Sequence, residues 1–133
     1  MSSANLDLVR AIYAEWGRGD WTSNWWADPE IETLIDIGFV KDEYKGIEEM
    51  ARGWGEFLSA WKNLRTVVEE FRELDDGRIL VLVRNTGEGK HSGLDVASLA
   101  GQGANLFEIR GGKVVRLEVF GHRQSGLEAA GLA

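Results

Sequence analysis

The chain of 133 residues has no cysteine, a single proline and two histidines. Without cysteine it has neither disulfides nor thiolate metal ligands, and its redox compartment cannot be read from the sequence. The two histidines, His91 and His122, lie far apart in the sequence, which is a poor basis for a metal site. We therefore expect no metal and no cofactor.

Basic residues are also scarce, with 15 lysines and arginines against 22 acidic residues and a net charge of −7. Nucleic acids and anionic membranes attract basic surfaces, so this balance disfavours both as partners. No uninterrupted apolar run approaches the ~20 residues of a spanning helix, and the first residues do not resemble a signal peptide. These features predict a soluble, cytoplasmic protein that forms a single domain over residues 1–133.

Helical patterns dominate the first half of the chain. Apolar residues recur at helical spacing over residues 5–16, with Asn5 as the expected N-cap. A short helix capped by Asp20 is predicted to carry three tryptophans before Pro29 stops it. Gly46 opens a longer helix, whose apolar stripe is Ile47, Met50, Trp54, Phe57, Leu58 and Trp61.

Strand patterns dominate the second half. Residues 64–74 and 79–88 flank Asp75-Asp76-Gly77, and residues 104–109 and 113–122 flank a glycine pair, which predicts two hairpins. We favour a three-residue loop, 110–112, in the second hairpin. This loop places Phe107 beside Val115 and Asn105 beside Leu117, with Val119 next along the same face. Residues 94–99 are predicted to be part of a long bent strand that follows a loop at 87–93.

Asp36 is a carboxylate in an otherwise apolar strand-like run formed by Ile31, Leu34, Ile35, Ile37 and Phe39. An acid among aliphatic side chains is destabilising unless it has a partner, and burial raises its pKa toward the range used in proton transfer. Two interpretations are open. Asp36 is a structural acid that caps the turn at Gly38 or pairs with a lysine, or it is a catalytic residue.

The order of these elements resembles that of the NTF2-like superfamily, and specifically its SnoaL-like domains. The resemblance covers nearly the whole chain and depends on four short segments: Gly19-Asp20, Tyr44-Lys45-Gly46, the Gly-Gly-Lys-Val-Val turn and residues 127–131. It implies an α+β fold, in which N-terminal helices pack on a curved, mixed but mainly antiparallel sheet. In that superfamily the sheet and helices form a cone that encloses a small-molecule pocket.

The resemblance also implies candidate catalytic residues. Ketosteroid isomerases of the superfamily carry a general-base aspartate at the position of Asp36. Their second pocket acid falls on Asn105, whose amide can also donate a hydrogen bond, and their tyrosine falls next to Tyr13. The related epoxide hydrolases use two aspartates and one arginine. Of these three residues, only the arginine has a counterpart here, Arg84. The predicted catalytic residues are therefore Asp36, Asn105 and Tyr13.

Two functions follow as hypotheses. The first is a cofactor-independent isomerase or cyclase, in which Asp36 moves a proton on an apolar carbonyl compound and Asn105 stabilises the enolate oxygen. The alternative is a non-catalytic ligand-binding or dimerisation domain. In both, we expect a small apolar or aromatic ligand, with Trp16, Trp25, Trp54, Phe57, Trp61, Arg84, Phe107, Leu117 and Val119 as the substrate-binding residues.

Ordinary core packing competes with ligand contact for the aromatic residues of the long helix. For Asn105, hydrogen bonding to a bulged backbone at Gly103 competes with the oxyanion role. The resemblance further implies a homodimer. Arg116, Glu118 and Phe120 on the outer sheet face are the expected interface.

Overall fold

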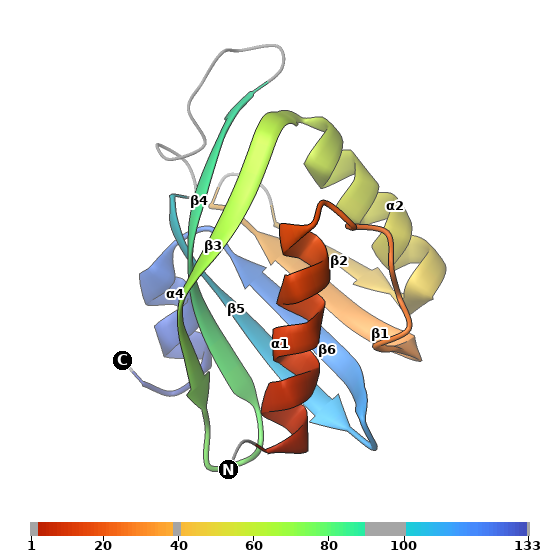
Figure 1. The fold of residues 1–133 in the computed structure, drawn as a ribbon, viewed down its shortest axis with the longest axis vertical. Coiled ribbons are helices and arrows are strands. Elements are labelled where there is room, and N and C mark those ends of the chain that lie inside the picture. The colour runs from red at the N-terminus through yellow and green to blue at the C-terminus, as the bar shows by residue number, and fades with distance from the viewer. Residues whose placement is uncertain (1–2, 39–40, 90–100, 133) are drawn as a thin grey trace.

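A computed structural model describes residues 3–38, 41–89 and 101–132 of the protein (Figure 1). In chain order its elements are α1 (Ala4–Gly17), β1 (Ala27–Asp36), β2 (Lys41–Lys45), α2 (Gly46–Ser59), β3 (Trp61–Glu73), β4 (Ile79–Gly89), β5 (Gln102–Arg110), β6 (Lys113–Phe120) and α4 (Arg123–Ala129). Within these residues, no helix is long and apolar enough to cross a membrane.

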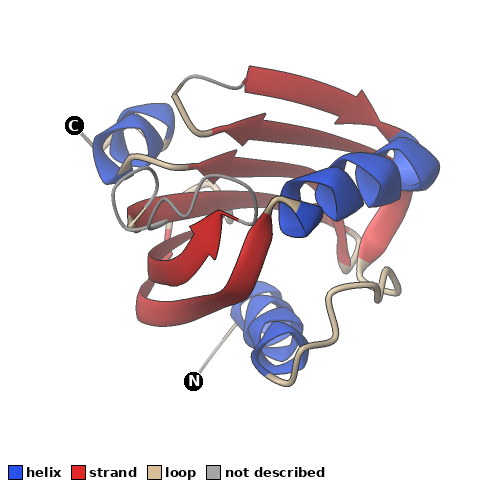
Figure 2. Cartoon of the chain, turned by 90° about the horizontal axis from the view of Figure 1, so that it is seen from above, coloured by secondary structure: helices blue, strands red, loops and turns tan. Residues whose placement is uncertain are grey.

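The strands form one sheet in the order β2-β1-β6-β5-β4-β3. β1 and β6 pair in parallel, while the other neighbouring strands pair antiparallel. The sheet is strongly curved, and β3 and β4 bend over toward α1 (Figure 2). The predicted α+β fold with a mixed, mainly antiparallel sheet is therefore confirmed.

Alternating side chains along each strand divide the core into two clusters. We call the sheet face that packs against α1 and α2 the inner face, and the opposite face, which packs against α4, the outer face (Figure 1). Ile79, Val81 and Val83 of β4 belong to the inner cluster, whereas Leu80 and Leu82 belong to the outer one. One strand thus contributes to both cores.

The expected short helix after Asp20 is wrong, because residues 18–26 form a loop and a turn. β1 already begins at Ala27 and includes Pro29. A proline is tolerated at this point of the strand because the β1–β6 register is interrupted between Ala27 and Glu32, and β2 pairs with β1 only from Glu32 onward. Of the tryptophans in residues 18–26, Trp26 belongs to the inner cluster and Trp21 packs against it.

The N-cap of α1 is Ser3 rather than Asn5. The side chain of Ser3 accepts a hydrogen bond from the backbone N–H of Leu6 at 3.0 Å. The amide of Asn5 instead donates to the carbonyl oxygen of Gly77 at 3.2 Å, in the turn between β3 and β4. Asn5 therefore ties α1 to the first hairpin.

The expected three-residue loop of the second hairpin is also wrong. Gly111 and Gly112 both have positive φ (57° and 79°), and Arg110 pairs directly with Lys113 across this two-residue turn. A bulge then shifts the register, so that Phe107 lies opposite Leu117 and Asn105 opposite Val119. Phe107 and Asn105 still share one face of the sheet, as predicted. The predicted register differs from the observed one by two residues, and a shift of two residues keeps a side chain on the same face.

The predicted strand at residues 94–99 lies outside the described residues, and so does most of the predicted loop at 87–93. β4 is described up to Gly89, and β5 begins at Gln102.

Candidate functional site

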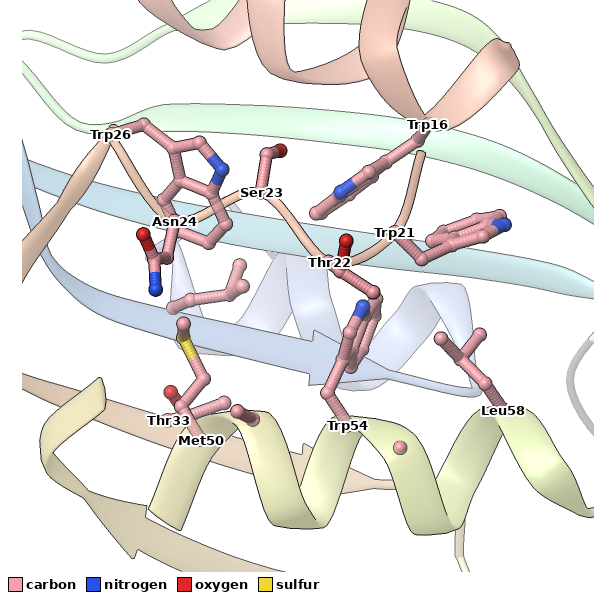
Figure 3. A pocket seen from close by; sticks show the side chains of 13 residues that line it. Trp16, Trp21, Thr22, Ser23, Asn24, Trp26, Thr33, Met50, Trp54 and Leu58 are labelled. Atoms are coloured by element: carbon pink, nitrogen blue, oxygen red, sulfur yellow. The ribbon is translucent and has the colours of Figure 1, made fainter. Parts of the chain in front are cut away.

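A cavity of about 110 Å³ opens between α1, α2, the loop after α1 and the inner face of the sheet (Figure 3). We call it the indole cavity, because four of the six tryptophans of the chain line it. Its lining residues are Trp16, Trp21, Thr22, Ser23, Asn24, Trp26, Thr33, Met50, Ala51, Trp54, Gly55, Leu58 and Leu117.

The four indoles form one contiguous cluster around Trp16, which lies in the last turn of α1. Its ring stacks on that of Trp21 with centroids 5.5 Å apart, and the Trp54 ring of α2 also lies at 5.5 Å. Trp26 meets it edge-on at 6.2 Å. Because the rings come from α1, the loop, the turn before β1 and α2, their positions depend on the whole fold rather than on one element.

The loop wall of the cavity is anchored by Glu15. Its carboxylate accepts hydrogen bonds from the Ser23 hydroxyl at 2.5 Å and from the indole N–H of Trp25 at 2.7 Å. The amine of Lys113 donates to the carbonyl oxygen of Trp25. In Figure 3, Thr22, Ser23 and Asn24 lie across the cavity from Met50, Trp54 and Leu58.

Three buried polar atoms of the cavity wall have no hydrogen-bond partner in the described part of the chain. They are Nε1 of Trp16, Nε1 of Trp26 and the hydroxyl oxygen of Thr33. These residues are 5%, 3% and 2% exposed. Buried polar groups are almost always hydrogen-bonded, so three unpaired groups around one cavity need an explanation.

A second, smaller cavity of about 30 Å³ adjoins the first and shares Trp16, Trp21 and Trp54 with it; its other lining residues are Phe57, Leu64, Thr66, Asn85, Asn105 and Val119. The amide of Asn105 donates to the phenol oxygen of Tyr13 at 2.6 Å. Burial raises the pKa of Tyr13 far above its usual range, although the hydrogen bond from Asn105 offsets part of that rise. Two of the predicted catalytic residues are therefore brought together, with Tyr13 neutral.

Asp36, the third predicted catalytic residue, is not brought to them. Ile35 and Ile37 belong to the inner cluster and Leu34 to the outer one, so strand alternation places Asp36 on the outer face. Its carboxylate accepts a hydrogen bond from the backbone N–H of Gly38 at 3.1 Å. The expected position of Asp36 in the cone is corrected, and its contact is that of the turn-capping acid considered as the alternative.

Arg84 also lies on the outer face, and its side chain is 62% exposed. Its guanidinium pairs with Glu69 of β3 at 2.7 Å, and Arg123 of α4 donates to the same carboxylate. These two hydrogen bonds lower the pKa of Glu69. The expected role of Arg84 in the pocket is therefore corrected to an ion pair between strands.

The predicted aromatic ligand contacts are divided among several places. Trp16 and Trp54 line the indole cavity, and Phe57 lines the adjoining one. Trp25 is instead 46% exposed, and its indole is bonded to Glu15. Trp61, at the start of β3, lines a different hollow with Tyr44.

Phe107, Leu117 and Val119 lie on the inner face as predicted. Leu117 lines the indole cavity and Val119 the adjoining one, whereas Phe107 is fully buried and packs edge-on against Tyr13. Phe107 is therefore a core residue, and its predicted contact with a ligand is corrected.

The sequence interpretation missed Trp21, Trp26 and Thr33 as cavity residues. The two tryptophans were recognised but assigned to a helix. The sequence does contain a signal for Thr33. Ile31, Thr33, Ile35 and Ile37 are alternate residues of one strand, so their side chains share one face.

Among the described residues that line the indole cavity, none carries an ionisable side chain. Within the described ranges, no group of three histidine, cysteine, aspartate or glutamate side chains could hold a metal ion. What the cavity offers is aromatic surface, a flexible methionine and hydrogen-bond donors. It can bind a flat apolar molecule and orient it through polar contacts.

No protein family model and no curated protein matches the sequence. Among solved structures, the fold is similar to that of an NTF2-like protein from Burkholderia pseudomallei, with a TM-score of 0.76 and 18% identity over 97% of this chain and 98% of that one. An NTF2-like protein from Burkholderia thailandensis aligns with a TM-score of 0.74 and 21% identity over 90% and 91% of the two chains.

A third similar structure is a protein with a ketosteroid isomerase-like fold from Catenulispora acidiphila, in complex with trimethylamine. It has a TM-score of 0.68 and 14% identity, and the alignment covers 96% of this chain and 94% of that one. The chain therefore has the NTF2-like fold that the order of its sequence elements implied.

Proposed function

We propose that the protein is a small-molecule-binding domain, whose indole cavity holds a flat apolar or aromatic ligand without carrying out chemistry on it. The observation that carries the proposal is the cavity itself: four indoles that contact one another line a space of about 110 Å³. Such a space is several times the ~10–15 Å³ that one water needs.

Core packing alone does not account for this space. Protein interiors are packed as densely as organic crystals, and a void costs stability because the atoms around it lose their contacts. Bringing four large aromatic residues to one place and leaving room between them is what ligand sites do. The solved neighbour in complex with trimethylamine supports the use of this fold for holding a small molecule.

The isomerase or cyclase hypothesis lacks a general base at the cavity. Proton abstraction needs a basic group within hydrogen-bond reach of the substrate. The described lining residues include no carboxylate or imidazole, and Asp36 lies on the opposite face of the sheet. Tyr13 is held neutral by its burial and cannot supply the base. We therefore favour binding over catalysis.

The test is a pair of tryptophan truncations, measured by isothermal titration with 2-acetonaphthone as a flat, uncharged probe. We expect saturable binding at a single site in the unaltered protein. Trp54→Ala should weaken it by about tenfold or more, because the indole supplies a large part of the aromatic wall. Trp61→Ala is the matched control, since Trp61 lines a different hollow and no part of the indole cavity.

Circular dichroism of both variants will confirm that they are folded at the temperature of the titration. Absence of saturable binding to the unaltered protein would overturn the proposal, and so would equal weakening by the two truncations.

A further inference from the structure

A second hollow lies beside the C-terminal half of α2, where this helix packs over β1 and β2 (Figure 1). We call it the α2 hollow. Its volume is about 240 Å³, against about 110 Å³ for the indole cavity, and the two share none of their described lining residues. The α2 hollow is lined by Ile35, Ile37, Asp42, Tyr44, Gly53, Glu56, Phe57, Ala60 and Trp61. It is therefore a separate candidate site.

Three aromatic rings form much of the wall of the α2 hollow. The ring of Tyr44 lies directly against the backbone of α2 at Gly53, where a β-carbon would overlap it. Phe57 and Trp61 meet edge-on, with ring centroids 6.3 Å apart. Because Tyr44 comes from β2, Phe57 from α2 and Trp61 from β3, the fold brings the three rings to one place. The wall is thus aromatic and held from several sides.

Two carboxylates, those of Asp42 and Glu56, complete the polar part of the lining. In the described part of the chain, neither forms an ion pair with a lysine or arginine. Burial raises the pKa of Tyr44, and the charges of Asp42 and Glu56 raise it further, so both carboxylates lie near the same ring. Arg52 lowers this pKa in part, but it is not among the residues that line the hollow.

The end of α2 adds to the negative potential of the hollow. The last carbonyl groups of a helix carry a partial negative charge, which a basic side chain in the last turn commonly balances. The last turn of α2 has no basic residue and carries Glu56 instead. An acid at this end of a helix is unfavourable unless a cation lies nearby. The α2 hollow therefore favours a positively charged ligand.

The wall also narrows the kind of cation. A primary ammonium group has three N–H donors, each of which needs an acceptor when it is buried. The buried wall residues Ile35 and Ile37 offer no acceptor in their side chains, and Asp42 and Glu56 are exposed. A quaternary ammonium group has no N–H donor, and it binds against the faces of aromatic rings. This type of cation fits an aromatic wall with carboxylates at its opening.

We propose that the α2 hollow binds a small quaternary ammonium compound. The methyl groups of the ligand lie against the rings of Tyr44, Phe57 and Trp61. Its positive charge lies near the carboxylates of Asp42 and Glu56. This is a second ligand site, beyond the proposed function, and it does not depend on what the indole cavity binds.

The first experiment compares three probes in ¹H–¹⁵N titrations of the whole chain. They are choline, 3,3-dimethylbutan-1-ol, in which carbon replaces the charged nitrogen, and ethanolamine, which keeps the charge but lacks the methyl groups. We expect choline to bind about tenfold or more tightly than the neutral alcohol, because the alcohol has no charge to interact with the rings and carboxylates. Choline should also bind more tightly than ethanolamine. The indole signal of Trp61 should change with choline and that of Trp16 should not.

The second experiment uses Glu56→Gln, with Glu48→Gln as the matched control. Both glutamates are exposed residues of α2, and both changes remove one negative charge, but Glu48 lies in the first turn and does not line the hollow. Affinity for choline should fall about two- to fivefold in Glu56→Gln and stay unchanged in Glu48→Gln. Glu56→Gln should melt no lower than the unaltered protein, because it removes an acid from the negative end of the helix.

Four outcomes would overturn the proposal. They are the absence of saturable choline binding, equal affinity for choline and the neutral alcohol, affinity for ethanolamine that equals that for choline, and equal weakening by the two glutamine variants. A choline-dependent change at Trp16 in place of Trp61 would also contradict it, because it would put the ligand in the indole cavity. None of these results bears on binding of 2-acetonaphthone, so the proposed function is tested separately.

Discussion

The two faces of the sheet are built from the same six strands but differ in composition. The outer face packs mainly aliphatic side chains against α4, and charged residues surround them; its buried cluster is Leu34, Leu80, Leu82, Ala104, Leu106, Phe120 and Ala130. The inner face packs aromatic side chains against α1 and α2 and leaves the indole cavity and three unpaired polar groups. We infer that ligand binding is confined to the inner face, which also holds the larger of the two buried clusters, and that the outer face contributes packing alone.

The ion pairs of the outer face fit this division. The guanidinium of Arg116 lies 3.2 Å from the carboxylate of Glu118, and it also contacts Glu32 and Glu43. Phe120, expected at a dimer interface, is buried in the outer cluster. Arg116 and Glu118 are thus engaged within the chain, and the homodimer stays a prediction.

The largest expected effect comes from the outer face. Leu80 is fully buried, and Leu80→Ala should lower the free energy of unfolding by about 2–5 kcal/mol in urea denaturation. Affinity for 2-acetonaphthone, measured while the variant is folded, should be unchanged. A large loss of affinity would show that the two faces are not separable. Val67→Ala, at a side chain that is 58% exposed, is the control for stability.

An intermediate effect on stability is expected from replacing two nearby glycines of α2, Gly53 and Gly55, by alanine. A β-carbon at Gly53 would overlap the ring of Tyr44, whereas one at Gly55, which lines the indole cavity, would meet nothing within 4 Å. Gly53→Ala should therefore destabilise the protein by about 1–3 kcal/mol. Gly55→Ala should instead stabilise it by up to about 1 kcal/mol, because alanine is the better helix former.

Thermal and urea denaturation of the two alanine variants measure this contrast. Equal destabilisation by both would mean that the cavity side of α2 is as tightly packed as the side that faces Tyr44, and would contradict the open space beside Gly55.

The smallest expected effect is that of Asp36→Asn. The asparagine side chain still offers an oxygen to the backbone N–H of Gly38, so the free energy of unfolding should change by no more than about 0.5 kcal/mol. Ligand affinity should not change at all, because Asp36 lies on the outer face. Loss of binding or of any turnover in this variant would restore Asp36 to the site and contradict the division of the faces.

The sequence predicted the fold well because periodicity and turn chemistry are local signals. The stripe of α2 and the two hairpins were recognisable. Trp16, Trp54 and Leu117, predicted to bind a ligand, line the indole cavity, and their role in binding stays a prediction. The face of Asn105 was also right despite the wrong loop, since a two-residue shift in register keeps side chains on the same side.

The errors arose where tertiary contacts override local patterns. Asp36 attracted attention as an acid in an apolar run, but it is out of phase with Ile31 and Ile35, and the phase of a strand decides its face. The loop after α1 was mistaken for a helix because its tryptophans resemble a helical face. Its real conformation depends on Glu15, through contacts that no local pattern encodes.

The central claim is that the inner face binds a ligand through its indoles. The most direct measurement is a ¹H–¹⁵N titration of the indole N–H signals with 2-acetonaphthone, assigned by single tryptophan-to-phenylalanine variants. We expect the signals of Trp16, Trp21, Trp26 and Trp54 to change and those of Trp25 and Trp61 to stay the same. Changes confined to Trp25 or Trp61, or no saturable change in any indole signal, would contradict it.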